Sequence, residues 1–271
     1  MENLLAQLRR EVFHGSPRTA VAMSEGIDWG DEGRWLRGVA LGAHGRYGCA
    51  LTVLAQIHSG SPWHSQALST SASLHRQLSR HAQARVLDFE ALDAALGVVD
   101  QGDAELGLAA DAVGLGDQVE ARSRWAKAVS SAEGDWRRSV RCSWVDTEIA
   151  LMNSDGPAAW AAASAALALS ADYRAPRHLV KSMLFAGVAA LQVQDVTSAA
   201  RLLRSALVQA ADSGAWPLVW PAATVLARIA PDSVVLRARA ASVVTAIAYG
   251  LPSEWRADWL ASVASVASVA S

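Results

Sequence analysis

The segment that most constrains the fold of this chain runs from Ala175 to Ala211. Pro176 stands where a helix can begin, because the first helical position needs no backbone N–H. An apolar run follows to Val193, a Gln-Asp pair interrupts it, and apolar side chains then recur at steps of three and four residues. This pattern predicts two amphipathic helices joined by a short turn. Neither helix can bury its apolar stripe alone, so further helical pairs must stack beside them.

The composition extends this prediction to the whole chain. Of 271 residues, 52% are hydrophobic, and Ala, Leu and Val dominate without any long segment rich in Val, Ile and Thr. Gly and Pro fall mostly between the apolar runs, and only Pro221 falls within a predicted helix, where it stands in the first turn or marks a kink. We therefore expect an all-α protein. Cys49 and Cys142 are too few and too far apart for a disulfide framework, and we expect two buried, reduced thiols.

Charge and hydropathy exclude several function classes. The net charge of −2 provides no basic surface for DNA, RNA or an anionic membrane. No apolar window approaches the ~18 residues of a membrane span, and the first residues mix charged and apolar side chains unlike a signal peptide. We expect a cytoplasmic protein that binds neither nucleic acid nor membrane directly.

Breaks in the apolar pattern divide the chain into four parts. We expect an N-terminal helix over 1–14, a loop or linker over 15–31, a helical repeat domain over 32–250, and a C-terminal capping helix with a low-complexity tail over 251–271. Ser61 and Asp155 are candidate N-caps. The tail, with Val at every third position, either continues the capping helix or frays, and we expect disorder toward its end.

One pattern recurs along the middle of the chain. In the segment described first, a small residue (Gly187) precedes a turn at Asp195, then Ala199, then a bulky residue four positions later, Leu203. An Ala at this anchor position lets two helix backbones approach closely, and the bulky residue fills the groove beside it. Anchors follow one another at intervals of 34 to 40 residues, at Ala50, Ala84, Ala121, Ala159, Ala199 and, in a weaker last copy after Asp232, Leu236.

This pattern resembles the tetratricopeptide repeat (TPR) family, whose ideal period is ~34 residues. The resemblance implies a right-handed α-solenoid of about six TPR-like helical hairpins with terminal capping helices. The sequence departs from the family in lacking most of the aromatic residues at the fourth repeat position and the terminal proline of the repeat. A generic α-helical bundle is the alternative.

The motifs of the common enzyme classes are missing. No two of the seven His lie four residues apart, and neither a phosphate-binding glycine loop nor a nucleophile motif is present. We therefore predict no catalytic residue, no cofactor and no metal, and expect that the protein is not an enzyme. An all-α enzyme whose site is assembled from distant residues is a third alternative.

The repeat frame instead predicts a binding groove. Trp35 and Trp144 occupy a first-helix position that points into the concave face of a TPR array. The Lys/Asn set by which some TPR domains clamp a terminal carboxylate is not reproduced. The full predicted set of partner-binding residues is Trp35, Arg76, Arg141, Trp144, Glu148, Lys181, Leu184, Phe185 and Arg228.

These residues suggest two functions. The first is a non-enzymatic scaffold whose groove binds a protein or peptide segment, since Trp and Arg dominate interface hot spots. The second is a ligand- or peptide-sensing regulator that acts on a transcription factor carried by another chain. A homodimer through exposed apolar helix faces is compatible with both.

Overall fold

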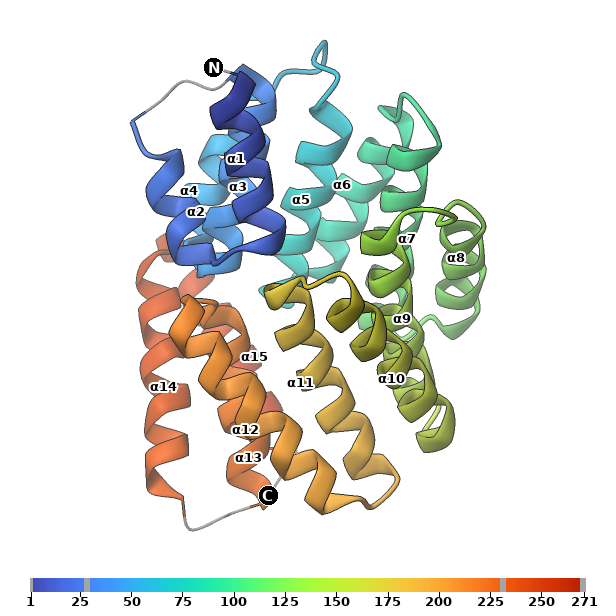
Figure 1. Ribbon diagram of the computed structural model, residues 1–271, viewed down its shortest axis with the longest axis vertical. Helices are drawn as coiled ribbons and strands as arrows, with labels where there is room; N and C mark the ends of the chain where they lie inside the picture. The colour runs from blue at the N-terminus through green and yellow to red at the C-terminus, as the bar shows by residue number, and fades with distance from the viewer. Residues whose placement is uncertain (1, 27–29, 230–232, 269–271) are drawn as a thin grey trace.

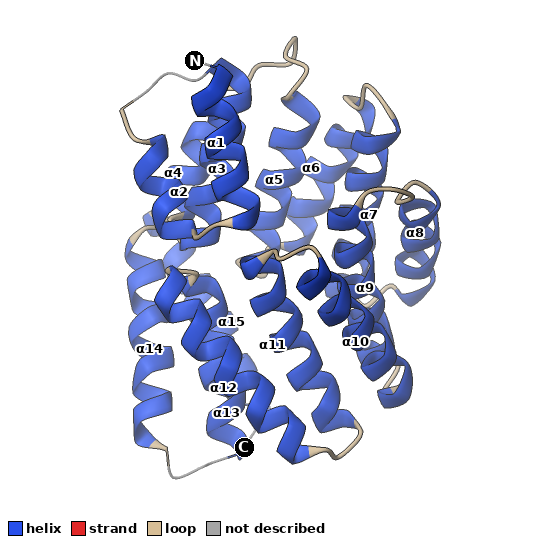
Figure 2. Ribbon diagram, in the orientation of Figure 1, coloured by secondary structure: helices blue, strands red, loops and turns tan. Residues whose placement is uncertain are grey.

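The computed structural model describes residues 2–26, 30–229 and 233–268, and the regular secondary structure there is entirely helical (Figure 2). None of these helices is both long enough and apolar enough to pass through a bilayer. The fifteen helices are α1 (Glu2–His14), α2 (Pro17–Ser24), α3 (Gly30–His44), α4 (Tyr47–Leu54), α5 (His64–Gln77), α6 (His81–Asp93), α7 (Val98–Leu115), α8 (Gln118–Ser130), α9 (Trp136–Met152), α10 (Gly156–Asp172), α11 (Pro176–Gln192), α12 (Val196–Ser213), α13 (Trp216–Ile229), α14 (Val234–Tyr249) and α15 (Ser253–Ser268).

Successive helices pack in pairs, and the pairs stack into an all-α solenoid, which confirms the predicted fold class (Figure 1). The repeat units are the six pairs from α3–α4 to α13–α14. The α1–α2 pair precedes them, and α15 follows them.

The prediction of a loop over 15–31 was wrong for residues 17–24, which form α2, and for residues 30–31, which begin α3. Residues 27–29 of the predicted loop lie outside the described residues. The Ser16 hydroxyl accepts a bond from the backbone N–H of Thr19 at 3.1 Å, and Pro17 occupies the first turn. The helix is only eight residues long, too short to show a periodic apolar stripe. At the other end, α15 continues through Ser268, so the low-complexity tail is helical that far, and residues 269–271 lie outside the described part of the chain.

The anchor positions confirm the repeat frame in five units. The side chains of Ala50, Ala84, Ala121, Ala159 and Ala199 are fully buried. The sixth anchor was wrong, because Leu236 is only half-buried and Ala240 is the first buried residue of α14. The expected turn residue of this unit, Asp232, lies outside the described residues.

The turns inside the repeats share one backbone geometry. In the five units from α3–α4 to α11–α12, the residue that precedes the N-cap of the second helix has a positive φ, between 57° and 90°, although only two of these residues are glycine. The N-cap residue then donates its backbone N–H to a carbonyl five residues earlier, as in a Schellman motif. Asp155 is confirmed as an N-cap, and Asp117 and Asp195 act alike. Ser61 is not the cap of α5, which begins after Trp63.

The solenoid closes on itself, so the early helices α3–α5 meet the late helices α13–α15 (Figure 1). The ring of His44 bonds the carbonyl of Gly214 at 2.7 Å, and the Arg18 guanidinium reaches the carbonyl of Ala211 at 3.4 Å. Trp255 of α15 lies 5.2 Å from the ring of His75. The largest hydrophobic core accordingly combines side chains of α1–α5 with those of α11–α15. The molecule is a closed ring of helices.

The expectations for Cys142 and Pro221 agree with the structure, and the expectation for Cys49 does not. Cys142 is buried, and burial raises the pKa of its thiol to about 11. Cys49 is exposed, contrary to expectation, because it lies on the outer face of α4 one residue before the buried anchor Ala50. Pro221 lies within α13, as expected.

Candidate functional site

The inner helices of the ring surround a cavity of about 530 Å³. Because each repeat turns its first helix inward, side chains of α3, α5, α7, α9, α11 and α13 line this space, and Phe13 of α1 reaches it from the N-terminal end. Eight of the nine predicted partner-binding residues stand in its wall: Trp35, Arg76, Arg141, Trp144, Glu148, Lys181, Leu184 and Phe185.

Arg228 is the exception, and its placement in the groove was wrong. The α13 residues that reach the cavity are Pro217, Leu218 and Trp220, all in the first turns of the helix. Arg228 stands in the last turn, exposed on another surface. The repeat frame fails here because only the N-terminal turns of α13 line the cavity.

The two groove tryptophans are built into the wall rather than projecting from it. Trp35 and Trp144 are only 5% and 7% exposed. The indole N–H of Trp35 donates to the hydroxyl of Thr70 at 3.0 Å, and that of Trp144 to the hydroxyl of Ser182 at 2.9 Å. Each bond joins one inner helix to the next. The tryptophans therefore fix the spacing of adjacent repeats and offer a ligand a small part of their surface.

Trp144 also belongs to an aromatic ladder between α9 and α11. His178 stacks on Trp144 with ring centroids 5.5 Å apart, and Phe185 lies 6.2 Å away on a nearly parallel plane. The ladder continues through Trp136 to Tyr173. Stacked rings of this kind make a rigid, mostly apolar wall.

On the α5–α7 side of the cavity, the cation Arg76 forms ion pairs with buried carboxylates. Arg76 bonds Asp88 of α6 and, at 3.0 Å, Asp111 of α7, and neither carboxylate is exposed to solvent. Burial raises the pKa of Asp88 and of Asp111, and Arg76 opposes that effect in both. The guanidinium thereby ties three helices together.

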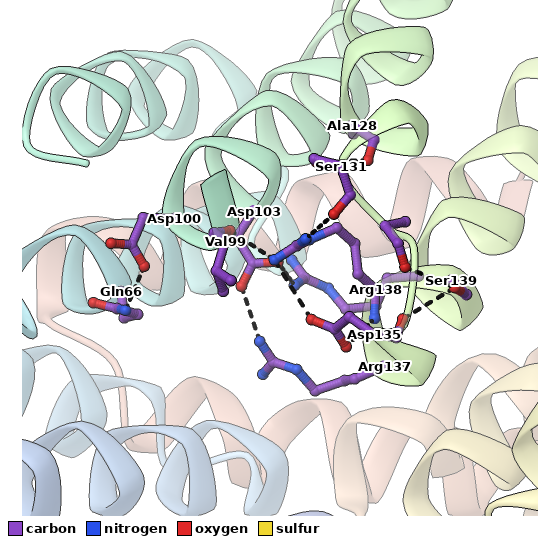
Figure 3. A network of polar contacts seen from close by, with 12 residues as sticks. Gln66, Val99, Asp100, Asp103, Ala128, Ser131, Asp135, Arg137, Arg138 and Ser139 are labelled. Atoms are coloured by element: carbon purple, nitrogen blue, oxygen red, sulfur yellow. Dashed lines mark hydrogen bonds and ion pairs between the residues drawn. The ribbon is translucent and has the colours of Figure 1, made fainter. Parts of the chain in front are cut away.

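A second ion-pair network lies at the start of α9 (Figure 3). Asp103 of α7 accepts bonds from Arg137 at 2.9 Å, from Arg138 at 3.3 Å and from Arg141 at 2.7 Å. Burial alone would raise the pKa of Asp103, but the three arginines outweigh burial and hold it below the usual value. One carboxylate thus serves three guanidinium groups, and Arg138 additionally bonds two backbone carbonyls and Asp135.

On the α11 side, two cations have no ion pair within the described part of the chain. Arg177 and Lys181 both line the cavity and both are half-buried. The Lys181 ammonium lies 4.3 Å above the Trp144 ring. Burial lowers its pKa to about 8, with Glu148 opposing this and Arg177 adding to it. Burial likewise lowers the pKa of Arg177, and the charges of Arg137 and Arg141 lower it further.

The neutral polar groups of the cavity also have free hydrogen-bonding capacity. The buried Nδ1 atoms of His81 and His178, the Ser69 hydroxyl and the Gln66 carbonyl oxygen have no protein partner among the described residues. Burial and four neighbouring cations lower the pKa of His178 well below its usual value, so its ring is neutral. Within the described residues no group of three His, Cys, Asp or Glu side chains is placed to hold a metal ion.

Sequence reasoning missed Arg137 and Arg177, although a signal for both was present. Arg137 and Arg141 precede Trp144 by seven and three residues. Leu184 takes the position of Trp144 in the next repeat, and Arg177 and Lys181 precede it by the same two intervals. The two cation pairs thus occupy the same two positions of consecutive repeats. Tyr47, whose hydroxyl donates to Gln77 at 3.0 Å, was missed because it lies at the start of a second helix.

Comparisons with known proteins support the fold alone. The sequence matches no known protein family, and it matches no curated protein. Among solved structures, the chain is similar to a Rap protein in its complex with competence and sporulation factor, with a TM-score of 0.62. The two share 9% sequence identity, and the match covers 95% of this chain and 77% of the Rap chain. This similarity agrees with an all-α helical-repeat architecture.

Proposed function

We propose that this protein is a non-enzymatic, cytoplasmic interaction module that binds a short peptide segment of a partner in the cavity of its closed solenoid. The observation that carries the proposal is the cavity itself. Its volume of about 530 Å³ lies within the ~300–1,000 Å³ of typical ligand pockets. A space of that size suits a few residues in extended form, and it is too small for a folded domain.

The composition of the wall supports a peptide ligand. Trp35, Trp144 and Phe185 provide rigid aromatic surface against which peptide side chains can pack. The Rap protein of similar fold was solved in complex with competence and sporulation factor, so a related architecture has been observed with a bound factor.

A pool of random-sequence pentapeptides tests the proposal, with retention by the protein measured by gel filtration and mass spectrometry. The wild type should retain peptides. Ala110→Trp, on the cavity face of α7, should reduce retention at least about tenfold because it fills the cavity. Ala161→Trp, on the exposed face of α10, is the matched control and should retain peptides as the wild type does. Equal retention by Ala110→Trp, or none by the wild type, would contradict the proposal.

A regulatory version of this function is favoured by the closure of the ring. Phe13 near the N-terminus and Trp220 near the C-terminal end both line the cavity, so a ligand contacts both ends of the solenoid. Binding can therefore change the outer surface where the ends meet, and a transcription factor on another chain is one target of such a change. Hydrogen exchange of α1–α2 and α14–α15 should slow on peptide binding. Unchanged hydrogen exchange would contradict the regulatory version and leave only the scaffold function.

A further inference from the structure

The charges that line the cavity are unbalanced. Five cations line it, and the lining carboxylates of the described residues are Asp103 and Glu148 alone. The cations are Arg76, Arg137, Arg141, Arg177 and Lys181.

The excess is concentrated on one wall. Arg76 is neutralised from behind by Asp88 and Asp111, so it contributes little net charge to the space. The other four cations come from α9 and α11. Asp103 forms ion pairs with two of them, Arg137 and Arg141, and with Arg138 as well. Arg177 and Lys181 have no carboxylate within ion-pair distance in the described residues, and the charge of Glu148 acts on Lys181 from further away.

The geometry of this wall suits more than one anionic group. Arg137 and Arg141 are four residues apart on α9, and Arg177 and Lys181 are four residues apart on α11. Residues at that spacing lie on the same helix face, about 6 Å apart along the axis. The cations therefore extend over a full helical turn on both helices. Asp103 already bridges the α9 pair, so the α11 pair is left for the anionic groups of a ligand.

Unpaired cations are costly to a fold. A half-buried charge without a partner loses hydration without a compensating ion pair, and a fold gains nothing by holding two of them side by side. Lys181 is nevertheless fixed in place, because its ammonium lies over the rings of both Trp144 and Phe185. An anionic ligand would supply the missing partners.

We infer that the α9–α11 wall is a subsite for acidic side chains, so that the cavity selects peptides carrying two or more Asp or Glu residues, with Arg177 and Lys181 as the principal contacts. This inference rests on the proposed function, since it names the class of peptide that the cavity takes. Arg137 and Arg141, held by Asp103, flank the subsite and provide the second pair of donors.

Three pentapeptide pools test the inference, again by retention and mass spectrometry. The first is acidic, with Asp and Glu at two positions, N-acetylated and C-terminally amidated. The second is its neutral counterpart, with Asn and Gln at those positions. The third is the neutral pool with a free terminal carboxylate. The wild type should retain the acidic pool at least about tenfold better than the neutral one, because a hydrogen bond between two charged groups is stronger than one between neutral groups.

Two matched double variants locate the effect. Arg177→Gln/Lys181→Gln should lose the preference for the acidic pool and still retain neutral peptides. Arg201→Gln/Arg204→Gln removes the same charge from the exposed face of α12 and should keep the preference. Melting temperatures of both variants, measured beside the wild type, confirm that each is folded.

The remaining outcomes separate the inference from the proposed function. Equal retention of the acidic and neutral pools would overturn the acidic subsite and leave peptide binding intact. A preference for the third pool over the first would replace it with a site for one terminal carboxylate, and so also overturn it. Retention of none of the pools would overturn both the inference and the proposed function.

Discussion

The two walls of the cavity solve the same physical problem differently. On the α5–α7 side, the Arg76 guanidinium is enclosed by two buried carboxylates. On the α11 side, Arg177 and Lys181 lack a carboxylate partner in the described part of the chain. The ion pairs of Arg76 stabilise the fold, whereas Arg177 and Lys181 can pair with an anionic ligand, as inferred above. Both walls therefore carry cations that line the cavity, but on the α5–α7 side the cation is paired within the fold and on the α11 side the cations are not.

The largest effect should follow from removing the paired cation. Arg76→Met would leave Asp88 and Asp111 buried side by side without a cation, and loss of one partner from a buried ion pair costs about 3–5 kcal/mol. Urea unfolding followed by circular dichroism measures this loss. Arg177→Met, a matched change on the other wall, should cost less than about 0.5 kcal/mol because no ion pair is broken. Similar losses for the two variants would remove the distinction between the walls.

Trp144→Ala should cause a comparable loss of unfolding free energy, because this side chain is part of the packed wall. Truncation of a buried aromatic side chain costs about 3–5 kcal/mol, and the indole bond to Ser182 is lost as well. Reduced peptide binding by this variant would therefore reflect a damaged wall. Trp144→Phe keeps most of the packing, and its free energy of unfolding, measured in urea, should fall by less than half as much. An equal loss for both variants would show that the bond to Ser182 dominates.

A smaller effect should appear in the pH dependence of stability. The pKa of Lys181 is about 8 in the folded protein, below its usual 10.5, so the unfolded chain binds more protons between these values. Stability from this group therefore rises with pH from about 8 to 10.5, and the penalty for burying the charge is fully present below pH 8. The difference in unfolding free energy between wild type and Lys181→Met, measured across that window, should shift in favour of the wild type as pH rises. A flat difference would show that solvent in the cavity hydrates the ammonium.

The smallest effect concerns a feature that the walls have in common. Ser79 on the α5–α6 turn and Gln194 on the α11–α12 turn have φ values of 60° and 62°. Replacement of either by Gly relieves about 1 kcal/mol of backbone strain and loses part of this to the greater freedom of unfolded Gly. Each variant should gain about 0.5 kcal/mol in thermal unfolding. Equal gains would show that the walls share one backbone frame and differ only in their charges, and a gain on one side alone would contradict that.

The sequence predicted the repeat frame because its signals are local. Ala50 and Ala199 show their role through the residues within one turn of helix, and the same spacing placed Trp35 and Trp144 on the concave side. It could not predict which cations are paired, because the partner of Arg76, Asp111, lies on another helix 35 residues later in the chain. The misplacement of Arg228 has the same cause: how α13 enters the ring depends on closure, and closure depends on contacts between opposite ends of the chain.

The bond between His44 and Gly214 joins residues 170 positions apart. In an open solenoid each repeat contacts only its neighbours, and units can fray from either end independently. Here the terminal units are one another's neighbours, so neither end is free to fray. Contacts of such long sequence separation form late and slow the folding of a chain. Closure therefore converts a row of semi-independent units into one cooperative body, in which the loss of a terminal hairpin weakens the opposite end as well.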